Sequence, residues 1–161
     1  MLKIKNVSVE DIPIWILLSK EYDDYVREVV PDLTEWYEGN GTTSLHFVDY
    51  MKSKIHKNEA FMAVDECDKC CGIVAFNQRT NNITFFGIFH EYDVTVVSEF
   101  LLRYALSKLD RSQSIKLNEL KSNAEQVQKI YAVLDKLGFV YRGEVLENGV
   151  PVNCMELSPN I

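Results

Sequence analysis

Apolar and polar positions follow two spacings along this chain, one typical of strands and one typical of helices. The stretch from Ile83 to Phe89 is β-branched and aromatic almost throughout, which predicts a strand that is buried on both faces. A polar break from His90 to Thr95 comes next. From Val96 to Leu109, apolar residues recur three and four positions apart, which predicts a helix that is apolar on nearly every side. A helix that follows a buried strand presents its free N–H groups to the loop between them, so this loop is a candidate anion site.

Similar patterns on either side of this unit predict the remaining elements. Alternation indicates strands, helical spacing indicates helices, and Gly, Pro and Asn mark the turns. The predicted elements are a strand over Leu2–Val7, a helix from Ile12 to just before Pro31, a loop over Asp32–Ser44 with Trp36 and Tyr37, a helix over Leu45–Lys57, strands over Ala60–Val64, Gly72–Gln78 and Ser114–Leu120, a helix over Asn123–Leu137, and strands over Phe139–Leu146 and Val150–Leu157. The order β-α-α-β-β-β-α-β-α-β-β predicts a mixed α/β (α+β) fold, with a central twisted mixed sheet of about seven strands and helices on both faces.

Two local signals refine the C-terminal part of this prediction. Asn123 with Gln126 and Ser122 with Glu125 match the capping-box pattern, and we expect the Asn123 side chain to cap the last helix. Asn148-Gly149 between two apolar runs is the strongest short signal for a β-hairpin.

Length and charge restrict the class of protein. A chain of 161 residues is long enough for one domain with a substantial core. The net charge of −7, from 17 basic and 24 acidic residues, argues against a nucleic-acid-binding protein. The chain has no apolar run long enough to span a membrane, and its first residues lack the pattern of a signal peptide, so we expect a cytoplasmic protein.

Three of the four cysteines cluster in Cys67-Asp68-Lys69-Cys70-Cys71, which has the spacing of half a zinc site. The second half is missing from the sequence, because Cys154 stands alone and the histidines are isolated. We therefore predict that these cysteines bind no structural metal and remain free thiols.

Several short motifs are similar to those of a known family. Asp11-Ile12-Pro13 opens the first predicted helix, Lys136-Leu137-Gly138-Phe139 closes the last one, and Ile115, Leu117 and Glu119 alternate before Asn123. Together with the order of elements, they resemble the GNAT superfamily of acetyl-coenzyme A-dependent N-acetyltransferases over nearly the whole chain. The resemblance implies a single GNAT-like domain over residues 1–161.

The signature loop of that family departs from its pattern here. In the family, Arg/Gln-x-x-Gly-x-Gly/Ala holds the pyrophosphate of coenzyme A through backbone amides and the N-terminus of the next helix. His90-Glu91-Tyr92 resembles the lead-in, but the aligned positions are Asp93, Val96 and Ser98, so the basic residue and the first glycine are lost. A valine side chain obstructs phosphate oxygens and an aspartate repels them, whereas the backbone N–H groups remain.

The resemblance implies acetyl-CoA (coenzyme A) as cofactor, bound between the fourth and fifth strands. The backbone of Phe86, Gly87 and Ile88 would pair with the pantetheine arm as an added strand does. The pyrophosphate would meet the segment made of Asp93, Val94, Thr95, Val96, Val97 and Ser98. Asn123, at the start of the last helix, is a further candidate for cofactor binding.

The resemblance also implies a tyrosine that protonates the departing thiolate, and a base that removes a proton from the amine. The position of the family's tyrosine is Leu134 here, and the nearest tyrosine is Tyr131, whose ordinary pKa of about 10 suits a thiolate leaving group. The alternative is that Tyr131 is a core residue. Glu119 is the candidate base, with Glu91 and His90 as alternatives.

The leading hypothesis is an N-acetyltransferase in which a primary amine of a small molecule or peptide attacks acetyl-CoA directly. The acidic net charge and Trp36-Tyr37 favour a small cationic or aromatic amine. Two alternatives remain open. One is a binding or regulatory module that has kept the fold and lost catalysis, suggested by Asp93, Val96 and Leu134. The other is a structural or oligomerising domain, for example a homodimer, that uses the Asn148-Gly149 hairpin as an interface.

Overall fold

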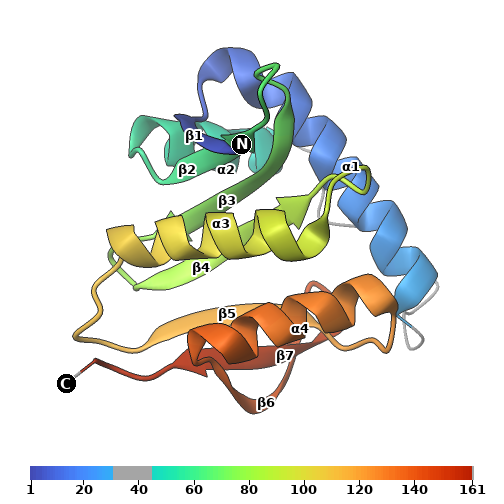
Figure 1. Ribbon diagram of the computed structural model, residues 1–161, viewed down its shortest axis with the longest axis vertical. Coiled ribbons are helices and arrows are strands. Elements are labelled where there is room, and N and C mark those ends of the chain that lie inside the picture. The colour runs from blue at the N-terminus through green and yellow to red at the C-terminus, as the bar shows by residue number, and fades with distance from the viewer. Residues whose placement is uncertain (31–44, 161) are drawn as a thin grey trace.

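A computed structural model describes residues 1–30 and 45–160 of the chain (Figure 1). Its elements are β1 (Lys3–Asn6), the short 3-10 helix η1 (Val9–Asp11), α1 (Ile12–Val29), α2 (Leu45–His56), β2 (Ala60–Val64), β3 (Cys70–Asn77), β4 (Asn82–Ile88), α3 (Val94–Lys108), β5 (Ile115–Leu120), α4 (Glu125–Leu137), β6 (Val140–Glu147) and β7 (Val150–Leu157). This order confirms the predicted one, and the aromatic loop predicted over residues 32–44 lies outside the described residues. None of the described helices combines the length and apolar character that crossing a membrane requires.

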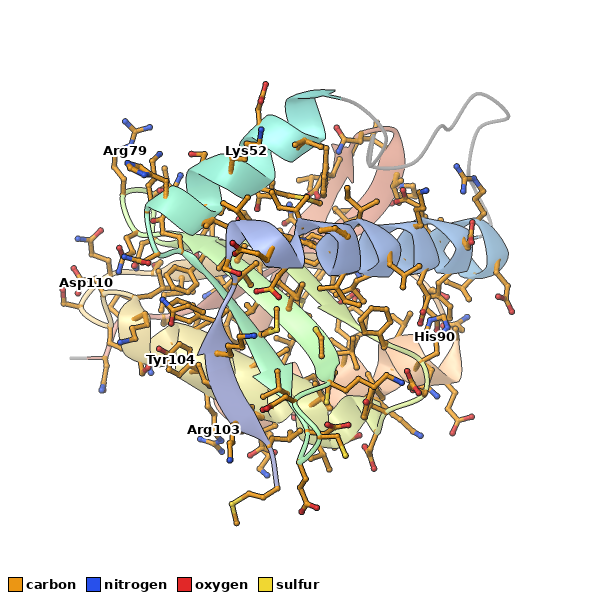
Figure 2. The ribbon with its side chains drawn as sticks, turned by 90° about the horizontal axis from the view of Figure 1, so that it is seen from above. Lys52, Arg79, His90, Arg103, Tyr104 and Asp110 are labelled. Carbon is orange, nitrogen blue, oxygen red and sulfur yellow. The ribbon has the colours of Figure 1, made fainter. Side chains whose placement is uncertain are left out.

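The strands form one mixed sheet with the order β1-β2-β3-β4-β5-β7-β6, which confirms the predicted fold class. Neighbouring strands are antiparallel except for β4 and β5, which are parallel. Helices α3 and α4 cover one face and α1 and α2 cover the other (Figures 1 and 2). Strand β2 shows the reason: Phe61 and Ala63 pack into the core under α3, whereas Ala60 and Met62 pack into the core under α1.

Strand β4 differs from the prediction of a strand buried on both faces. Thr84 is exposed, and Phe85, Phe86 and Ile88 are only partly buried. The parallel ladder joins β4 to β5 at one pair among the described residues, Asn82 with Lys116, and the strands then diverge. The register of β4 against β3 shifts at Thr84, and such a bulge redirects the side chains around it. Divergence therefore leaves the centre of the sheet open where a continuous ladder would bury it.

The Asn148-Gly149 hairpin is confirmed, because β6 and β7 pair on either side of it. Both turn residues have positive φ, 52° for Asn148 and 80° for Gly149, as a type I′ turn requires. The turn fixes Glu147, the last residue of β6, opposite Val150 of β7.

Two helix starts differ from the predicted ones. Helix α3 begins at Val94, two residues early, because the Asp93 carboxylate caps it by accepting from the N–H groups of Thr95 (2.9 Å) and Val96 (3.1 Å). The prediction that Asn123 caps the last helix is wrong, since Ala124 occupies the N-cap position of α4 and its side chain makes no capping hydrogen bond. Ser122 instead makes the side-chain hydrogen bonds just before α4.

We expect Ser122→Ala to lower the free energy of unfolding by about 1 kcal/mol, and Asn123→Ala to change it by less than about 0.5 kcal/mol. The Ser122 hydroxyl donates to the Val29 carbonyl at 2.8 Å and accepts from the Ala124 N–H at 3.1 Å, so it links the end of α1 to the start of α4. Urea denaturation of both variants measures the difference. A larger loss in Asn123→Ala than in Ser122→Ala would contradict it.

Candidate active site

Two pockets lie where β4 and β5 diverge, and they share Tyr22, Phe86 and Glu119. The first, here the hairpin pocket, has a volume of about 370 Å³ and reaches the β6–β7 turn. The second, here the loop groove, has a volume of about 240 Å³ and reaches the loop after β4. The hairpin pocket is lined by Tyr22, Phe47, Tyr50, Asn82–Phe86, Leu117–Glu119, Glu147 and Asn148; the loop groove by Tyr22, Tyr25, Glu28, Phe86–His90, Tyr92, Val94, Glu119, Leu120, Gln126, Val127 and Ile130.

Glu119, the predicted base, lies at the junction of the two pockets near the end of β5. Glu119 is only 6% exposed, and one of its carboxylate oxygens accepts a hydrogen bond from the N–H of Leu120 at 2.8 Å. Burial raises the pKa of Glu119 to about 7, and the nearby charge of Glu147 adds to the shift. A carboxylate with this pKa can accept a proton near neutral pH, whereas an ordinary glutamate is a much weaker base.

The two alternative bases are placed differently. Glu91 forms an exposed ion pair with Lys69 at 3.1 Å and does not line either pocket among the described residues. His90, labelled in Figure 2, lines the loop groove, where its backbone N–H donates to Glu21 at 2.7 Å. Of the three candidates, Glu119 alone borders both pockets within the described part of the chain.

Tyr131 does not line either pocket among the described residues. Its hydroxyl donates to the carbonyl of Leu120 at 2.6 Å and accepts from the amide of Asn153 at 3.1 Å. Burial raises the pKa of Tyr131. This hydroxyl therefore connects α4 to β5 and β7 directly beside Glu119.

The sequence did not indicate which aromatic residues line the hairpin pocket. Tyr22 comes from α1, and the centroid of its ring lies 6.5 Å from the centroid of the Phe85 ring. Tyr50 comes from α2, and its hydroxyl lies 2.6 Å from that of Thr84 at the bulge. Burial raises the pKa of Tyr50 to about 12, and Glu147 contributes to that shift. Helical spacing could mark these tyrosines as apolar-face residues but could not show that the face borders a pocket.

Glu147 also went unnoticed in the sequence, because a glutamate before a hairpin turn is ordinarily solvated. Glu147 is exposed in the structure as well, and its Oε2 accepts from the Asn118 amide at 2.6 Å. The charged residues among the described lining of the hairpin pocket are Glu119 and Glu147, and no lysine or arginine belongs to the described lining of either pocket. The site is therefore aromatic and acidic.

The loop groove runs along an edge of β4 that can pair with an extended ligand. Phe86, Gly87 and Ile88 line it, and this part of β4 has no ladder partner on the β5 side among the described residues. Unpaired backbone groups at a strand edge can pair with an extended chain. A side chain on Gly87 would crowd Phe85 and Leu18, at 3.3 Å and 3.4 Å from the added Cβ.

The predicted pyrophosphate segment divides into two parts. Val94 lines the loop groove, and Asp93, Thr95 and Val96 form the N-terminus of α3. Val97 and Ser98 are buried, and the Ser98 hydroxyl bonds to the Val94 carbonyl of its own helix. Asn123 does not line the groove among the described residues, where Gln126 and Val127 do.

The helix N-terminus already holds an anion, and that anion is Asp93. Its carboxylate occupies the N–H groups of Thr95 and Val96, the groups that would otherwise meet a phosphate. A phosphate could meet these N–H groups only after the Asp93 side chain had left them.

The cysteine cluster lies away from both pockets. Cys67 is exposed in the turn before β3, whereas Cys70 and Cys71 are buried in the strand itself. Among the residues that the structure describes, no group of three or more His, Cys, Asp and Glu side chains is placed to hold a metal ion.

No family model matches this chain, and no curated protein matches it in sequence. Solved structures do match its fold. A GNAT-family acetyltransferase from Streptococcus agalactiae is 13% identical, with 99% of this chain and 96% of that chain covered and a TM-score of 0.69. The NatC complex bound to Gag peptide and CoA gives 15% identity, 99% coverage of both chains and a TM-score of 0.66. The spermidine/spermine N-acetyltransferase SpeG from Vibrio cholerae gives 17% identity, coverage of 98% and 92%, and a TM-score of 0.60. The chain therefore has the GNAT acetyltransferase fold.

Proposed function

We propose that this protein is an N-acetyltransferase that transfers an acetyl group from acetyl-CoA to a positively charged primary amine of a small molecule or peptide. The observation that carries this proposal is the position of Glu119, a buried carboxylate with a pKa of about 7 where the two pockets meet. The fold supports it, since a spermidine/spermine acetyltransferase and a complex solved with peptide and CoA share that fold. A cytoplasmic location stays a prediction.

The hairpin pocket takes the acceptor. An ammonium group is attracted by the faces of Tyr22, Tyr50 and Phe85 and by the carboxylates. Glu119 accepts the proton that the ammonium group must lose before its nitrogen can react. Because the carboxylate is buried, it binds this proton more readily than an exposed glutamate does.

The loop groove takes the donor. The backbone of Phe86 to Ile88 would hold the pantetheine arm, and the N-terminus of α3 would hold a phosphate. Acetyl-CoA, when bound, supplies an acetyl thioester. Tyr25 lines the groove, and burial raises the pKa of its hydroxyl, which therefore stays protonated and able to donate. We propose this donor role for Tyr25. Tyr131 is instead a positioning residue that holds β5 at Glu119.

A second candidate function rests on Asp93. If its carboxylate never leaves the N-terminus of α3, the protein binds a cationic amine without transferring an acetyl group to it. A homodimer is compatible with either function, because the edge strand β6 exposes Tyr141, Val145 and Leu146.

Release of free thiol from acetyl-CoA over a panel of primary amines tests the proposed function. Turnover that depends on the amine is the expected result. If no amine is acetylated and calorimetry detects no acetyl-CoA binding at millimolar concentration, the acetyltransferase proposal is overturned.

Asp93→Asn is expected to tighten acetyl-CoA binding about two- to fivefold at low salt, with a smaller gain at high salt. Asparagine caps helices as well as aspartate does, so the variant removes charge and retains the preference for this position. Calorimetric titration at two salt concentrations measures both effects. Equal affinity of the two proteins at low salt would show that the Asp93 charge does not oppose the cofactor.

A further inference from the structure

The Glu147 carboxylate is held in place at the mouth of the hairpin pocket. Glu147 is the last residue of β6, and it pairs with Val150 across the type I′ turn, which fixes its backbone. The side chain is fixed by the 2.6 Å hydrogen bond from Asn118. Asn118 belongs to β5, and β7 lies between β5 and β6, so this bond reaches across a whole strand. It uses one carboxylate oxygen and orients the group over the pocket.

The negative charge of Glu147 affects two other residues of the pocket lining. It contributes to the raised pKa of Glu119 on β5 and to that of Tyr50 on α2. Glu147, Glu119 and Tyr50 all line the hairpin pocket, so the Glu147 carboxylate borders the same cavity as the other two residues. The remaining lining includes the aromatic rings of Tyr22, Phe47 and Phe85 beside amide and aliphatic side chains.

The two carboxylates cannot serve the same cation through the reaction. Once Glu119 has taken a proton from the reacting amine, that nitrogen is neutral, and so is Glu119. Glu147 still carries its charge in a pocket whose described lining contains no lysine or arginine. Glu147 is exposed at the mouth of the pocket, where a second cation can reach it, and the aromatic rings beside it favour the same sign of charge.

We infer, on the basis of the proposed function, that the acceptor carries a second positive charge: one amine faces Glu119 and reacts, while the other ammonium group binds Glu147. The acceptor class is therefore an aliphatic diamine or a longer amine with a second ammonium group. Glu147 is the specificity-determining residue, and Asn118 positions it.

The test compares 1,4-diaminobutane with n-pentylamine, which has nearly the same shape and ends in a methyl group where the diamine has its second ammonium group. For the wild type we expect a KM about three- to fivefold lower for the diamine, because one ion pair with the exposed Glu147 carboxylate is gained. Glu147→Gln should raise the KM for the diamine by the same factor and so remove the preference for the diamine over pentylamine. Glu144→Gln is the matched control: it removes a carboxylate from the same strand, one that pairs with Lys121 and lies outside the described lining of both pockets.

Binding of the two amines without acetyl-CoA, followed by calorimetry, separates this inference from the proposed function. If neither amine is acetylated but the diamine binds more tightly than pentylamine, and Glu147→Gln removes that preference, the second-charge inference stands and the transfer reaction is refuted. If the wild type binds and uses both amines equally, or if Glu147→Gln leaves the preference for the diamine unchanged, the inference is overturned even where acetylation is observed.

Discussion

Glu119→Gln is expected to lower kcat/KM for amine acetylation by about 10²- to 10⁴-fold, the usual contribution of a general base. Glutamine retains the shape of the side chain but cannot accept the proton. In the wild type, kcat/KM should rise with pH through about 7, because the pKa of Glu119 is raised to about 7 by burial and the base acts in its ionised form. In Glu119→Gln this limb of the pH profile should disappear. The control Glu144→Gln should retain both rate and profile.

Glu119→Gln is expected to stabilise the folded protein at high pH, although it lowers activity. The pKa of Glu119 is raised in the folded protein, so folding favours the protonated form, and the stability contribution of that proton is fully present below the ordinary pKa of a glutamate. It is lost as the pH rises through about 7, since folding then buries a charged group. At pH 8, Glu119→Gln should therefore raise the free energy of unfolding, by as much as about 3 kcal/mol.

Activity and stability are both measured, because together they distinguish loss of the base from misfolding. A variant that loses activity because it misfolds would also lose stability, whereas the expected variant is slower and more stable. Wild-type activity in Glu119→Gln would remove the main support for the proposed mechanism. Lost activity with reduced stability at pH 8 would assign Glu119 a structural role instead.

Lys54→Met is expected to lower the free energy of unfolding by about 3–5 kcal/mol, because it leaves a buried charge without its partner. The Lys54 ammonium group donates to Glu59 at 3.1 Å and to the carbonyl of Phe76 at 2.6 Å. Both charged side chains are almost fully buried, with exposed fractions of 7% and 6%. The second oxygen of Glu59 accepts from the N–H of Gln78 at 2.6 Å, so one ion pair ties α2 to the end of β3. Guanidinium denaturation measures the loss.

Two further variants separate charge from packing. Lys54→Met with Glu59→Gln removes both charges and retains an acceptor for Gln78, so we expect it to recover at least half of the lost stability. Lys69→Met breaks the exposed pair between Lys69 and Glu91 and should cost less than about 1 kcal/mol. If Lys54→Met costs no more than Lys69→Met, the buried pair does not stabilise this fold.

The order of elements was predictable because it depends on local patterns. Alternation, helical spacing and the Asn148-Gly149 turn each act within a few residues, and the structure confirms the resulting order and the mixed sheet. Prediction failed where one residue had two possible roles. Asp93 was expected in a loop before a helix starting at Val96, but it caps a helix that starts at Val94. Asn123 was expected to cap α4, but Ser122 makes the contacts there, one of them with α1.

The sequence by itself therefore determined the elements, their order and the apolar faces that bury against one another, because periodicity decides which side of a helix or strand avoids water. From the sequence, Glu119 could be identified only as a glutamate near the end of a predicted strand. Its burial, its raised pKa and its position between two pockets depend on the divergence of β4 and β5. The tertiary structure alone brought Tyr22, Tyr50 and Glu147 together from α1, α2 and β6, because distances between remote segments are set by how the layers pack and leave no trace in local spacing.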